Sequence, residues 1–376
     1  MAGKMSSQRL TVLFAGGGSA GHLLPAFATE EALRAGSFER TFSPCKTVYL
    51  ATVGGAELPL LKQAGAEFKI VPKSDLPRKI NRDLLTFIPR LVVAVSRTAK
   101  LIKQLDVDVV VGFGGYVALP AYCAARLTDT PLIIHEANAL PGLGNRFGRR
   151  IATRAFSNFP IDNWGAENAI GLPIREAISS IATLSSERRA ELMRAARSDF
   201  GLEPERKTIL IFGGSLGAAK INEVVGQSVD ELLTRGFQIL HAVGPENSLP
   251  INRPGYHALP YISRMDQAYL AADVVLSRSG AGTCAEIEAA GLPALLIPLP
   301  IGNGEQLLNA KALGAKAEVR IIENSALTRD SLIAAITDLA REDFKSASHS
   351  QPQAAAAIVA KTIVQLASER KQRRSA

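Results

Sequence analysis

The strongest candidate for chemistry is a glycine-rich loop that ends in a histidine. The stretch VLFAGGGSAGHLLPAFATEEAL runs from an apolar, strand-like segment through Gly16-x-Gly18-x-x-Gly21 to His22, and then into a helical pattern. Glycines at this spacing let a backbone approach a phosphate group closely, and the N-terminus of the following helix would favour its negative charge. Histidine, with an ordinary pKa of about 6.5, suits a general base. Ordering of the loop or capping of the helix is its alternative role.

The same glycine spacing is typical of dinucleotide-binding folds, but a second requirement of those folds is not met. There, an acidic residue closes the second strand and holds the adenosine ribose. The second strand-like segment here, KTVYLATVGG, ends in Ala51-Thr52-Val53 without an acid. The loop therefore predicts a phosphate-binding backbone without predicting NAD, and an NAD-dependent dehydrogenase stays open only as a rival class.

A second glycine-rich loop, FGGSLGAAKIN, follows an apolar run at residues 209–212. Gly213 and Gly214 permit close approach of a ligand, Ser215 offers a hydroxyl, and a helix beginning after Gly217 would direct N–H groups into the loop. A pyrophosphate fits this arrangement without any basic side chain. A tight turn that needs glycine only for packing is the alternative.

A third loop, in the stretch ADVVLSRSGAGTCAEIEAAGLPALLIPLP, adds groups that suit a sugar nucleotide. Small residues from Ser279 to Thr283 follow a strand-like run and open a helix that carries Glu286 near its first turn. A carboxylate there can accept both hydroxyls of a ribose, and Gln306 downstream can bond sugar hydroxyls. The alternative for Glu286 is an acid that the helix dipole favours, and the alternative for Gln306 is a solvent-facing helix residue.

Parallel sheets are the elements expected to position these loops. Short apolar runs alternate with helical patterns, which is typical of parallel sheets covered by helices on both faces. The sequence therefore predicts an α/β fold with two doubly wound, Rossmann-like domains facing each other across a cleft, and ligands at the carboxyl ends of strands. The expected strands include residues 47–50, 107–111, 132–134, 209–212, 274–276 and 294–297.

The expected boundary lies in AIGLPIREAI, where Gly171 and Pro173 interrupt regular structure and separate residues 1–171 from residues 172–351. The last helical pattern, about 352–376, is expected to pack back on the first domain. The pair Asp106-x-Asp108 resembles a metal-nucleotide motif of some glycosyltransferases. It precedes its strand, at the wrong end of the sheet, so no metal site is predicted there.

Composition limits the class of protein further. With 376 residues, 47% of them hydrophobic, the chain can bury a large core. No signal peptide is expected, because the apolar run 10–15 is too short for a signal core and passes straight into glycines. No membrane span is expected, because glycines and a proline interrupt the uncharged run 109–125. Three cysteines without a CxxC pair favour a reducing cytoplasm and no zinc site.

Residues 69–103 combine basic and apolar side chains, with 9 basic against 2 acidic groups. Scarce aromatic residues argue against nucleic acid as the partner, and an anionic membrane surface suits the mixture better. An amphipathic core helix is the alternative. The residues predicted to meet the membrane are Leu76, Arg78, Lys79, Ile80, Arg82, Leu84, Leu85, Phe87 and Ile88.

These loops, together with FGGY, HEANALPG, GLPIR and YISRM, resemble the MurG family, the UDP-N-acetylglucosamine:lipid I N-acetylglucosaminyltransferases of peptidoglycan synthesis. The resemblance runs from Leu10 to about Ala340 in the family's motif order. Departures are GGSAGH where the family has GGTGGH, HEAN where it has HEQN, and fewer glutamines around Gln306. The resemblance implies a GT-B fold and an inverting single displacement that requires no cofactor and no metal.

The resemblance also assigns roles to individual positions. It puts the acceptor diphosphate against Gly17, Gly18, Gly114, Gly115 and Tyr116. His22 is the favoured base, and Glu136 is the next candidate. Uracil would lie near Ile262 and Arg175, and the ribose would bind Glu286. The phosphates would bind Ser215, Ala281, Gly282 and Thr283. The sugar would lie near Asn138, Gln306, Ser19, Ala20 and Gly21.

The implied location is the cytoplasmic face of the cell membrane, as a peripheral protein. Its expected partners are UDP-N-acetylglucosamine, lipid I and an anionic lipid surface; other cell-wall enzymes stay open as partners. Three alternatives also stay open: another UDP-sugar transferase, a UDP-sugar 2-epimerase of the same fold, and a noncatalytic sugar-nucleotide-binding protein or membrane adaptor.

Overall fold

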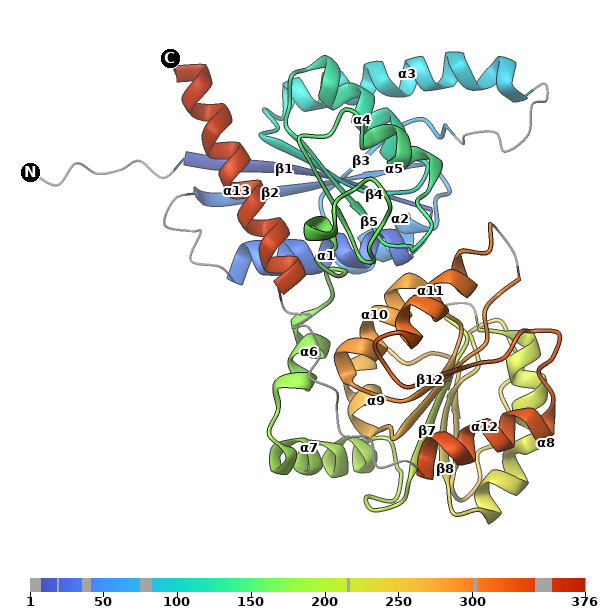
Figure 1. Ribbon diagram of the computed structural model, residues 1–376. Coiled ribbons are helices and arrows are strands. Elements are labelled where there is room, and N and C mark those ends of the chain that lie inside the picture. The colour runs from blue at the N-terminus through green and yellow to red at the C-terminus, as the bar shows by residue number, and fades with distance from the viewer. Residues whose placement is uncertain are drawn as a thin grey trace, which may run out of the picture. The chain divides into compact units, whose positions relative to one another are not determined.

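Two parallel six-stranded sheets organise the chain (Figure 1). The computed structural model describes residues 8–18, 20–35, 42–74, 83–214, 217–300, 303–341 and 354–375. Contacts group the chain into a first unit, Met1–Ala137, Pro141–Arg175 and Ala354–Ala376, and a second unit, Asn138–Leu140 and Glu176–Gln353. Each sheet has helices on both faces, so the predicted α/β class with two doubly wound domains is confirmed.

The first sheet has the strand order β3-β2-β1-β4-β5-β6. Neighbours β1 and β4 are separated in sequence by two further strands, so the connections run in opposite directions on either side of this pair. In such sheets, ligands bind outside the carboxyl ends of the strands at this reversal. The strands are β1 (Gln8–Gly16), β2 (Phe42–Ala51), β3 (Phe68–Ile70), β4 (Val109–Gly114), β5 (Leu132–Glu136) and β6 (Arg154–Ser157).

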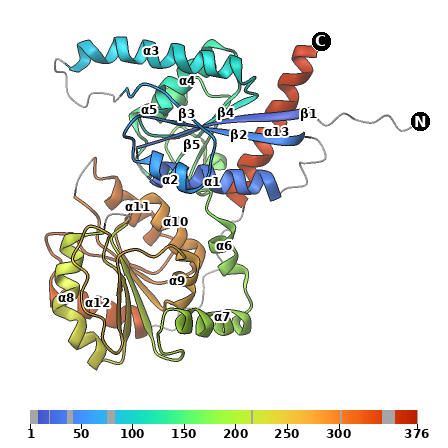
Figure 2. The same ribbon diagram turned by 180° about the vertical axis from the view of Figure 1, so that it is seen from behind.

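Alternating side chains of the strands point to opposite faces of the first sheet and pack into two separate hydrophobic cores. Val12 and Phe14 of β1 pack with α1, α2 and α13, whereas Leu13 and Ala15 pack with α3 and α4 on the opposite face (Figures 1 and 2). The helices are α1 (Ala20–Ala35), α2 (Glu57–Gln63), α3 (Asp83–Gln104), α4 (Ala118–Leu127), α5 (Leu143–Gly148) and α13 (Ala354–Ser375), with the short 3-10 helix η2 (Ala166–Asn168).

Helix α13 is fastened to the amino end of β4 by charged groups. Arg370, which is buried, donates to the carbonyl oxygen of Val107 at 2.9 Å. Lys371 Nζ lies 3.2 Å from the buried carboxylate of Asp108, and Arg374 Nη1 lies 2.7 Å from Asp106. The Asp106-x-Asp108 pair therefore anchors a helix.

The second sheet repeats the arrangement with the order β12-β11-β10-β7-β8-β9, and its reversal lies between β10 and β7. Helices α8 and α12 pack on one face of this sheet, and α9 and α10 lie on the other (Figures 1 and 2). The strands are β7 (Thr208–Phe212), β8 (Gln238–Ala242), β9 (Tyr256–Leu259), β10 (Val274–Ser277), β11 (Ala294–Leu296) and β12 (Val319–Ile321). The helices are α6 (Glu176–Ser179), η3 (Ser180–Thr183), α7 (Ser186–Asp199), α8 (Ala219–Thr234), α9 (Met265–Ala271), α10 (Ala281–Ala290), α11 (Glu305–Gly314) and α12 (Arg329–Arg341).

Each of the six predicted strand runs overlaps an observed strand. Strands β3, β6, β8, β9 and β12 were not among them, because they are short or less apolar than the central strands. Among the described residues, no helix combines the length and the apolar character that crossing a bilayer would require.

The anchoring of α13 makes a testable prediction for stability. Asp108→Asn removes the charge that faces Lys371 at a buried site, and should lower the free energy of unfolding by roughly 1.5–3 kcal/mol. The control Asp106→Asn breaks an exposed pair and should cost less than about 1 kcal/mol. Urea unfolding followed by the fluorescence of Trp164, the single tryptophan of the chain, reports on the first unit. Equal losses in the two variants would contradict the anchoring role.

Candidate active site

Two glycine loops of the first unit touch each other at the reversal between β1 and β4. The N–H of Gly17 approaches the carbonyl oxygen of Gly114 at 3.4 Å. Gly115 has a φ of +82°, and a Cβ built there would lie 1.9 Å from the Gly17 oxygen. Only glycine fits, since any side chain would push the two loops apart. The loops that the sequence assigned to a diphosphate are thus brought together in one place.

His22 follows the first of these loops and is held by it. Its Nδ1 lies 2.9 Å from the carbonyl oxygen of Gly17. A carbonyl oxygen can only accept, so Nδ1 carries the proton and the lone pair of the neutral ring is on Nε2. Burial lowers the pKa of His22, against the opposing effects of the Glu136 charge and the Gly17 hydrogen bond. A neutral imidazole at neutral pH is the form that can accept a proton.

Glu136 closes β5 and is 2% exposed. Its Oε2 accepts hydrogen bonds from the N–H of Gly142 at 3.1 Å and from Asn145 Nδ2 at 2.9 Å. Asn145 in turn accepts a bond from the hydroxyl of Tyr122 at 2.7 Å. The carboxylate is therefore fixed, and its charge acts on His22. This geometry suits electrostatic support of the histidine.

The sequence reasoning missed Glu57, a carboxylate with no exposed surface at the start of α2. Its Oε2 accepts from the N–H of Gly18 at 3.1 Å and from the hydroxyl of Tyr116 at 2.6 Å, and its Oε1 accepts from the N–H of Thr52 at 2.9 Å. Burial acts to raise the pKa of Glu57, but the hydrogen bonds outweigh it and the pKa lies below its ordinary value. Glu57 thus ties three loop segments together as an anion.

A signal for Glu57 was present in the sequence. It lies just after Gly54-Gly55, beyond the end of β2, which pairs with β1. The dinucleotide fingerprint predicts an acid at the end of the strand, where it would bind a ribose. The acid comes a few residues later and binds the protein's own glycine loop.

The second unit offers helix N-termini at its own reversal. Gly280, which precedes α10, makes no side-chain cap, and the first bond inside the helix runs from the N–H of Cys284 to the Gly280 oxygen at 2.9 Å. The N–H groups of residues 281–283 therefore precede the intrahelical ladder and can meet an anion. A Cβ at Gly282 would meet open space, so a ligand can approach there.

The glycine loop after β7 lies beside this helix end in the sheet order. Gly214 and Gly217 have φ values of +90° and +78°, and the N–H of Gly217 donates to the Gly214 oxygen at 3.1 Å. A Cβ at Gly217 would lie 2.1 Å from the carbonyl oxygen of Val243, so glycine is required for packing. Ser215, predicted to hold a phosphate, lies outside the described residues.

Glu286 and Gln306 are both tied to the second unit by hydrogen bonds. Glu286 lies in the second turn of α10, not the first, and its Oε2 accepts from the hydroxyl of Tyr269 at 2.9 Å. The Gln306 amide oxygen accepts from the N–H of Leu299 at 2.9 Å. Because the amide oxygen of Gln306 is already bonded within the protein, its NH₂ group is the part suited to a sugar hydroxyl.

The remaining predicted donor contacts are divided between the units. Asn138 belongs to the second unit, where it accepts a bond from Asn309 Nδ2 at 3.1 Å. Ile262 is buried in the second unit, whereas Arg175 is the last residue of its segment in the first. Gly21 and Ala20 lie at the start of α1, and Ser19 lies outside the described residues.

The predicted membrane segment is described only from the start of α3. Phe87 is only 8% exposed, so it packs inward and the prediction that it enters a lipid interface is wrong. Its neighbour Ile88 is 59% exposed. An amphipathic pattern does not reveal which apolar residues face the core. Leu76, Arg78, Lys79, Ile80 and Arg82 lie outside the described residues, as do the side chains of Leu84 and Leu85.

Within the described ranges, no group of three or more His, Cys, Asp or Glu side chains could hold a metal ion.

Comparison with known proteins identifies the family. Residues 12–157 match the glycosyltransferase family 28 N-terminal domain, and residues 208–366 match the family's C-terminal domain. The chain belongs to glycosyltransferase family 28. The two matches cover both sheets and all of the glycine loops described above.

Relatives and a solved structure extend this likeness over nearly the whole chain. The UDP-N-acetylglucosamine--N-acetylmuramyl-(pentapeptide) pyrophosphoryl-undecaprenol N-acetylglucosamine transferase of Mycolicibacterium smegmatis is 41% identical over 91% of this chain and 89% of its own. The enzyme of the same name from Rhodococcus erythropolis is 39% identical over 98% and 97%. The crystal structure of Acinetobacter baumannii MurG is 29% identical, covers 95% of this chain and 99% of its own, and has a TM-score of 0.70.

Buried His135, beside Glu136, predicts a pH dependence of stability. Its Nε2 lies 2.7 Å from the Gly171 carbonyl oxygen, and burial lowers its pKa from 6.5 to about 4. The unfolded chain therefore binds more protons between these pH values, and stability is lost as the pH falls from about 6.5 toward 4. The free energy of unfolding of the first unit should drop by about 2 kcal/mol more between pH 7.5 and 5 in the parent than in His135→Gln. Identical pH dependence by Trp164 fluorescence would contradict this.

Proposed function

We propose that this protein transfers N-acetylglucosamine from UDP-N-acetylglucosamine to the 4-hydroxyl of the muramyl sugar of lipid I, which gives lipid II. The observation that carries the proposal is the match to transferases of that name at about 40% identity over 89% or more of both chains. The glycine loops at the carboxyl ends of strands and the neutral imidazole of His22 support it. The enzyme is thus a hexosyltransferase of peptidoglycan synthesis.

The donor binds to the second unit in this proposal. Its diphosphate lies against the loop that holds Ser215 and against the N-terminus of α10 at Ala281, Gly282 and Thr283, where backbone amides supply positive potential. Glu286 accepts the ribose hydroxyls, and the uracil lies by Ile262. Asn138 and the NH₂ group of Gln306 hold the sugar.

The acceptor binds to the first unit, with its diphosphate at the paired glycine loops. Because the N–H of Gly18 already donates to Glu57, we place the diphosphate contacts mainly at Gly114–Tyr116. Lys73 adds a positive charge there, since its Nζ lies 5.1 Å from the centre of the Tyr116 ring. This cation offsets the repulsion between the diphosphate and the buried Glu57 carboxylate.

The reaction is a single displacement with inversion at the anomeric carbon. The muramyl oxygen O4 forms a bond to that carbon as the bond to the UDP oxygen breaks, and UDP leaves with the electron pair. The proton of the 4-hydroxyl goes to His22 Nε2. Backbone amides at the helix N-termini stabilise the negative charge that develops on the leaving diphosphate.

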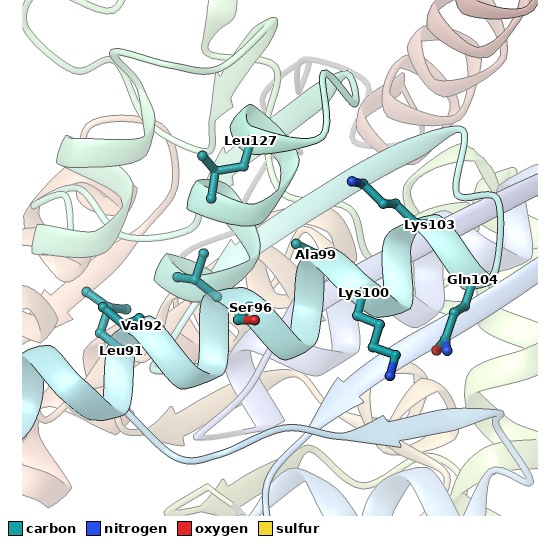
Figure 3. A pocket seen from close by; sticks show the side chains of 9 residues that line it. Leu91, Val92, Ser96, Ala99, Lys100, Lys103, Gln104 and Leu127 are labelled. Carbon is teal, nitrogen blue, oxygen red and sulfur yellow. The ribbon is translucent and has the colours of Figure 1, made fainter.

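We also propose that α3 meets the cytoplasmic face of the cell membrane, where the lipid-linked acceptor is held. On this helix Ile88, Val92 and Val93 are 59%, 61% and 46% exposed, and basic residues follow. An open apolar groove of about 710 Å³ runs along the helix, and Leu127 of α4, 72% exposed, lies at its other wall (Figure 3). The groove is lined by Leu91, Val92, Val95, Ser96, Ala99, Lys100, Lys103, Gln104 and Leu127. Exposed apolar groups edged by lysines suit an anionic lipid interface.

Radiolabel transfer tests the function as a whole. Label from UDP-N-acetylglucosamine should appear in a lipid I analogue at a rate that depends on the protein concentration. Binding of UDP-N-acetylglucosamine without transfer would instead indicate a sugar-nucleotide-binding protein. Binding of NADH would return the dehydrogenase class to consideration.

Donor binding makes a second prediction. Glu286→Ala removes a charged acceptor from the ribose and should weaken UDP binding by roughly 1.5–3 kcal/mol. Glu305→Ala is a suitable control, because Glu305 is the same type of acid at the start of α11 and its carboxylate accepts from the nearby Asn303 N–H. Calorimetry that finds the same affinity in the parent and Glu286→Ala would remove Glu286 from the ribose site.

The role of His22 makes a third prediction. His22→Ala should lower turnover by about 100-fold or more, while the affinity for UDP-N-acetylglucosamine stays close to that of the parent. Steady-state kinetics and calorimetry together separate these effects. Near-normal turnover, or a defect confined to donor affinity, would exclude His22 as the base.

Membrane docking makes a fourth prediction, which flotation with anionic vesicles can test. Ile88→Asp combined with Val92→Asp should release the protein from the vesicles, because two charged carboxylates cannot enter the lipid interface. Ile251→Asp is the control, since Ile251 is 90% exposed in the second unit. Parent binding should also weaken at high salt. A double variant that floats as well as the parent would exclude this surface.

A further inference from the structure

One peptide group connects the buried carboxylate of Glu57 to the imidazole of His22. The N–H of Gly18 donates to Glu57 Oε2 at 3.1 Å. The carbonyl of the same peptide, which belongs to Gly17, accepts from His22 Nδ1 at 2.9 Å. The two side chains thus bind opposite ends of a single planar peptide group. A displacement of either side chain would change the hydrogen bond of the other.

The geometry of this connection is fixed on all sides. Gly18 has a φ of +89°, and a Cβ there would lie 2.8 Å from the Tyr116 ring. Glu57 is fully buried, and bonds from Tyr116 and Thr52 hold both of its oxygens. The carboxylate therefore cannot turn away from the Gly18 N–H without leaving several donors unsatisfied.

An anion on the N–H of a peptide makes its carbonyl oxygen a better acceptor, because hydrogen bonds in a chain polarise one another. The Gly17 oxygen then binds a neutral Nδ1–H well and a protonated imidazole better still. In a Ser-His-Asp triad, a carboxylate stabilises the protonated histidine by a direct hydrogen bond to its Nδ1–H. Here a peptide group stands between the two.

We propose that Glu57 is a positioning residue for the transfer reaction and acts on His22 through the Gly17–Gly18 peptide. It fixes the tautomer in which Nδ1 carries the proton, and it stabilises the imidazolium that forms when Nε2 takes the proton of the acceptor hydroxyl. This inference rests on the proposed role of His22 as the base.

Glu136 at the end of β5 also acts on the His22 ring by its charge. Lys73 lies over the ring of Tyr116, whose hydroxyl donates to Glu57. Glu57→Gln leaves the charges of Glu136 and Lys73 unchanged. A difference between the parent and a Glu57 variant therefore isolates the contribution of Glu57.

The test is Glu57→Gln, which keeps the size of the side chain and removes its charge. Glutamine has one acceptor oxygen, so it cannot serve both the Gly18 and the Thr52 N–H groups. NMR of histidine-labelled protein without substrate should give a His22 pKa lower than in the parent by roughly half a unit to one unit. Turnover should fall by about tenfold, with the acid limb of its pH profile moved in the same direction and an unchanged KM for the donor.

Thr52→Val is the matched control. It removes the bond from Thr52 Oγ1 to Glu57 Oε1, at 3.2 Å, but keeps the carboxylate charge and the Gly18 bond. The His22 pKa and the pH profile of this variant should match those of the parent. A merely structural role would lower the stability of both variants without moving the His22 pKa in either.

An unchanged His22 pKa in folded Glu57→Gln overturns the proposal, as does an equal shift in Thr52→Val. If Trp164 fluorescence shows that Glu57→Gln does not fold, the ring nitrogen shifts of His22 in the parent decide. A neutral ring protonated at Nδ1 supports the proposal, and one protonated at Nε2 overturns it. These readouts need no turnover, so they are distinct from the failure of the proposed function, which would appear as no transfer of label to the lipid I analogue by the parent. Failure of the base role alone would appear as full turnover by His22→Ala.

Discussion

Contact of backbone with backbone at the reversal of the first sheet is the constraint on which the candidate site depends. The loops after β1 and β4 meet so closely that a Cβ at Gly115 would overlap the Gly17 oxygen. This contact fixes the direction of the Gly17 carbonyl, and the carbonyl in turn holds Nδ1 of His22. The glycines thus create room for a phosphate and also set the orientation of the imidazole that would take a proton.

The two units place opposite charges near their reversals. In the first, the carboxylates of Glu57 and Glu136 are buried near the glycine loops and His22, which favours a histidine that gains positive charge during the reaction. In the second, the uncapped N-terminus of α10 offers positive potential where a diphosphate would gain negative charge. The displacement requires a proton acceptor and a stabilised leaving group, and we propose that the first unit supplies the acceptor and the second stabilises the leaving group.

Hydrophobic runs predicted the two sheets, because buried parallel strands must be apolar on both faces. The same reasoning placed His22 and the α10 loop at carboxyl ends of strands, where they lie. It missed Glu57, since its partners Gly18, Thr52 and Tyr116 are distant in sequence and meet only because β2, β1 and β4 are neighbours. It also misplaced Phe87, because helical periodicity gives the apolar residues but not which of them the sheet covers.

If backbone amides of the second unit hold the donor diphosphate, their chemical shifts must change when labelled protein is titrated with UDP. We expect the largest shifts at Gly213, Gly217 and residues 281–283, and the same shifts with or without a metal chelator. Shifts centred instead on Gly17, Gly18 and residues 114–116 of the first unit would contradict it.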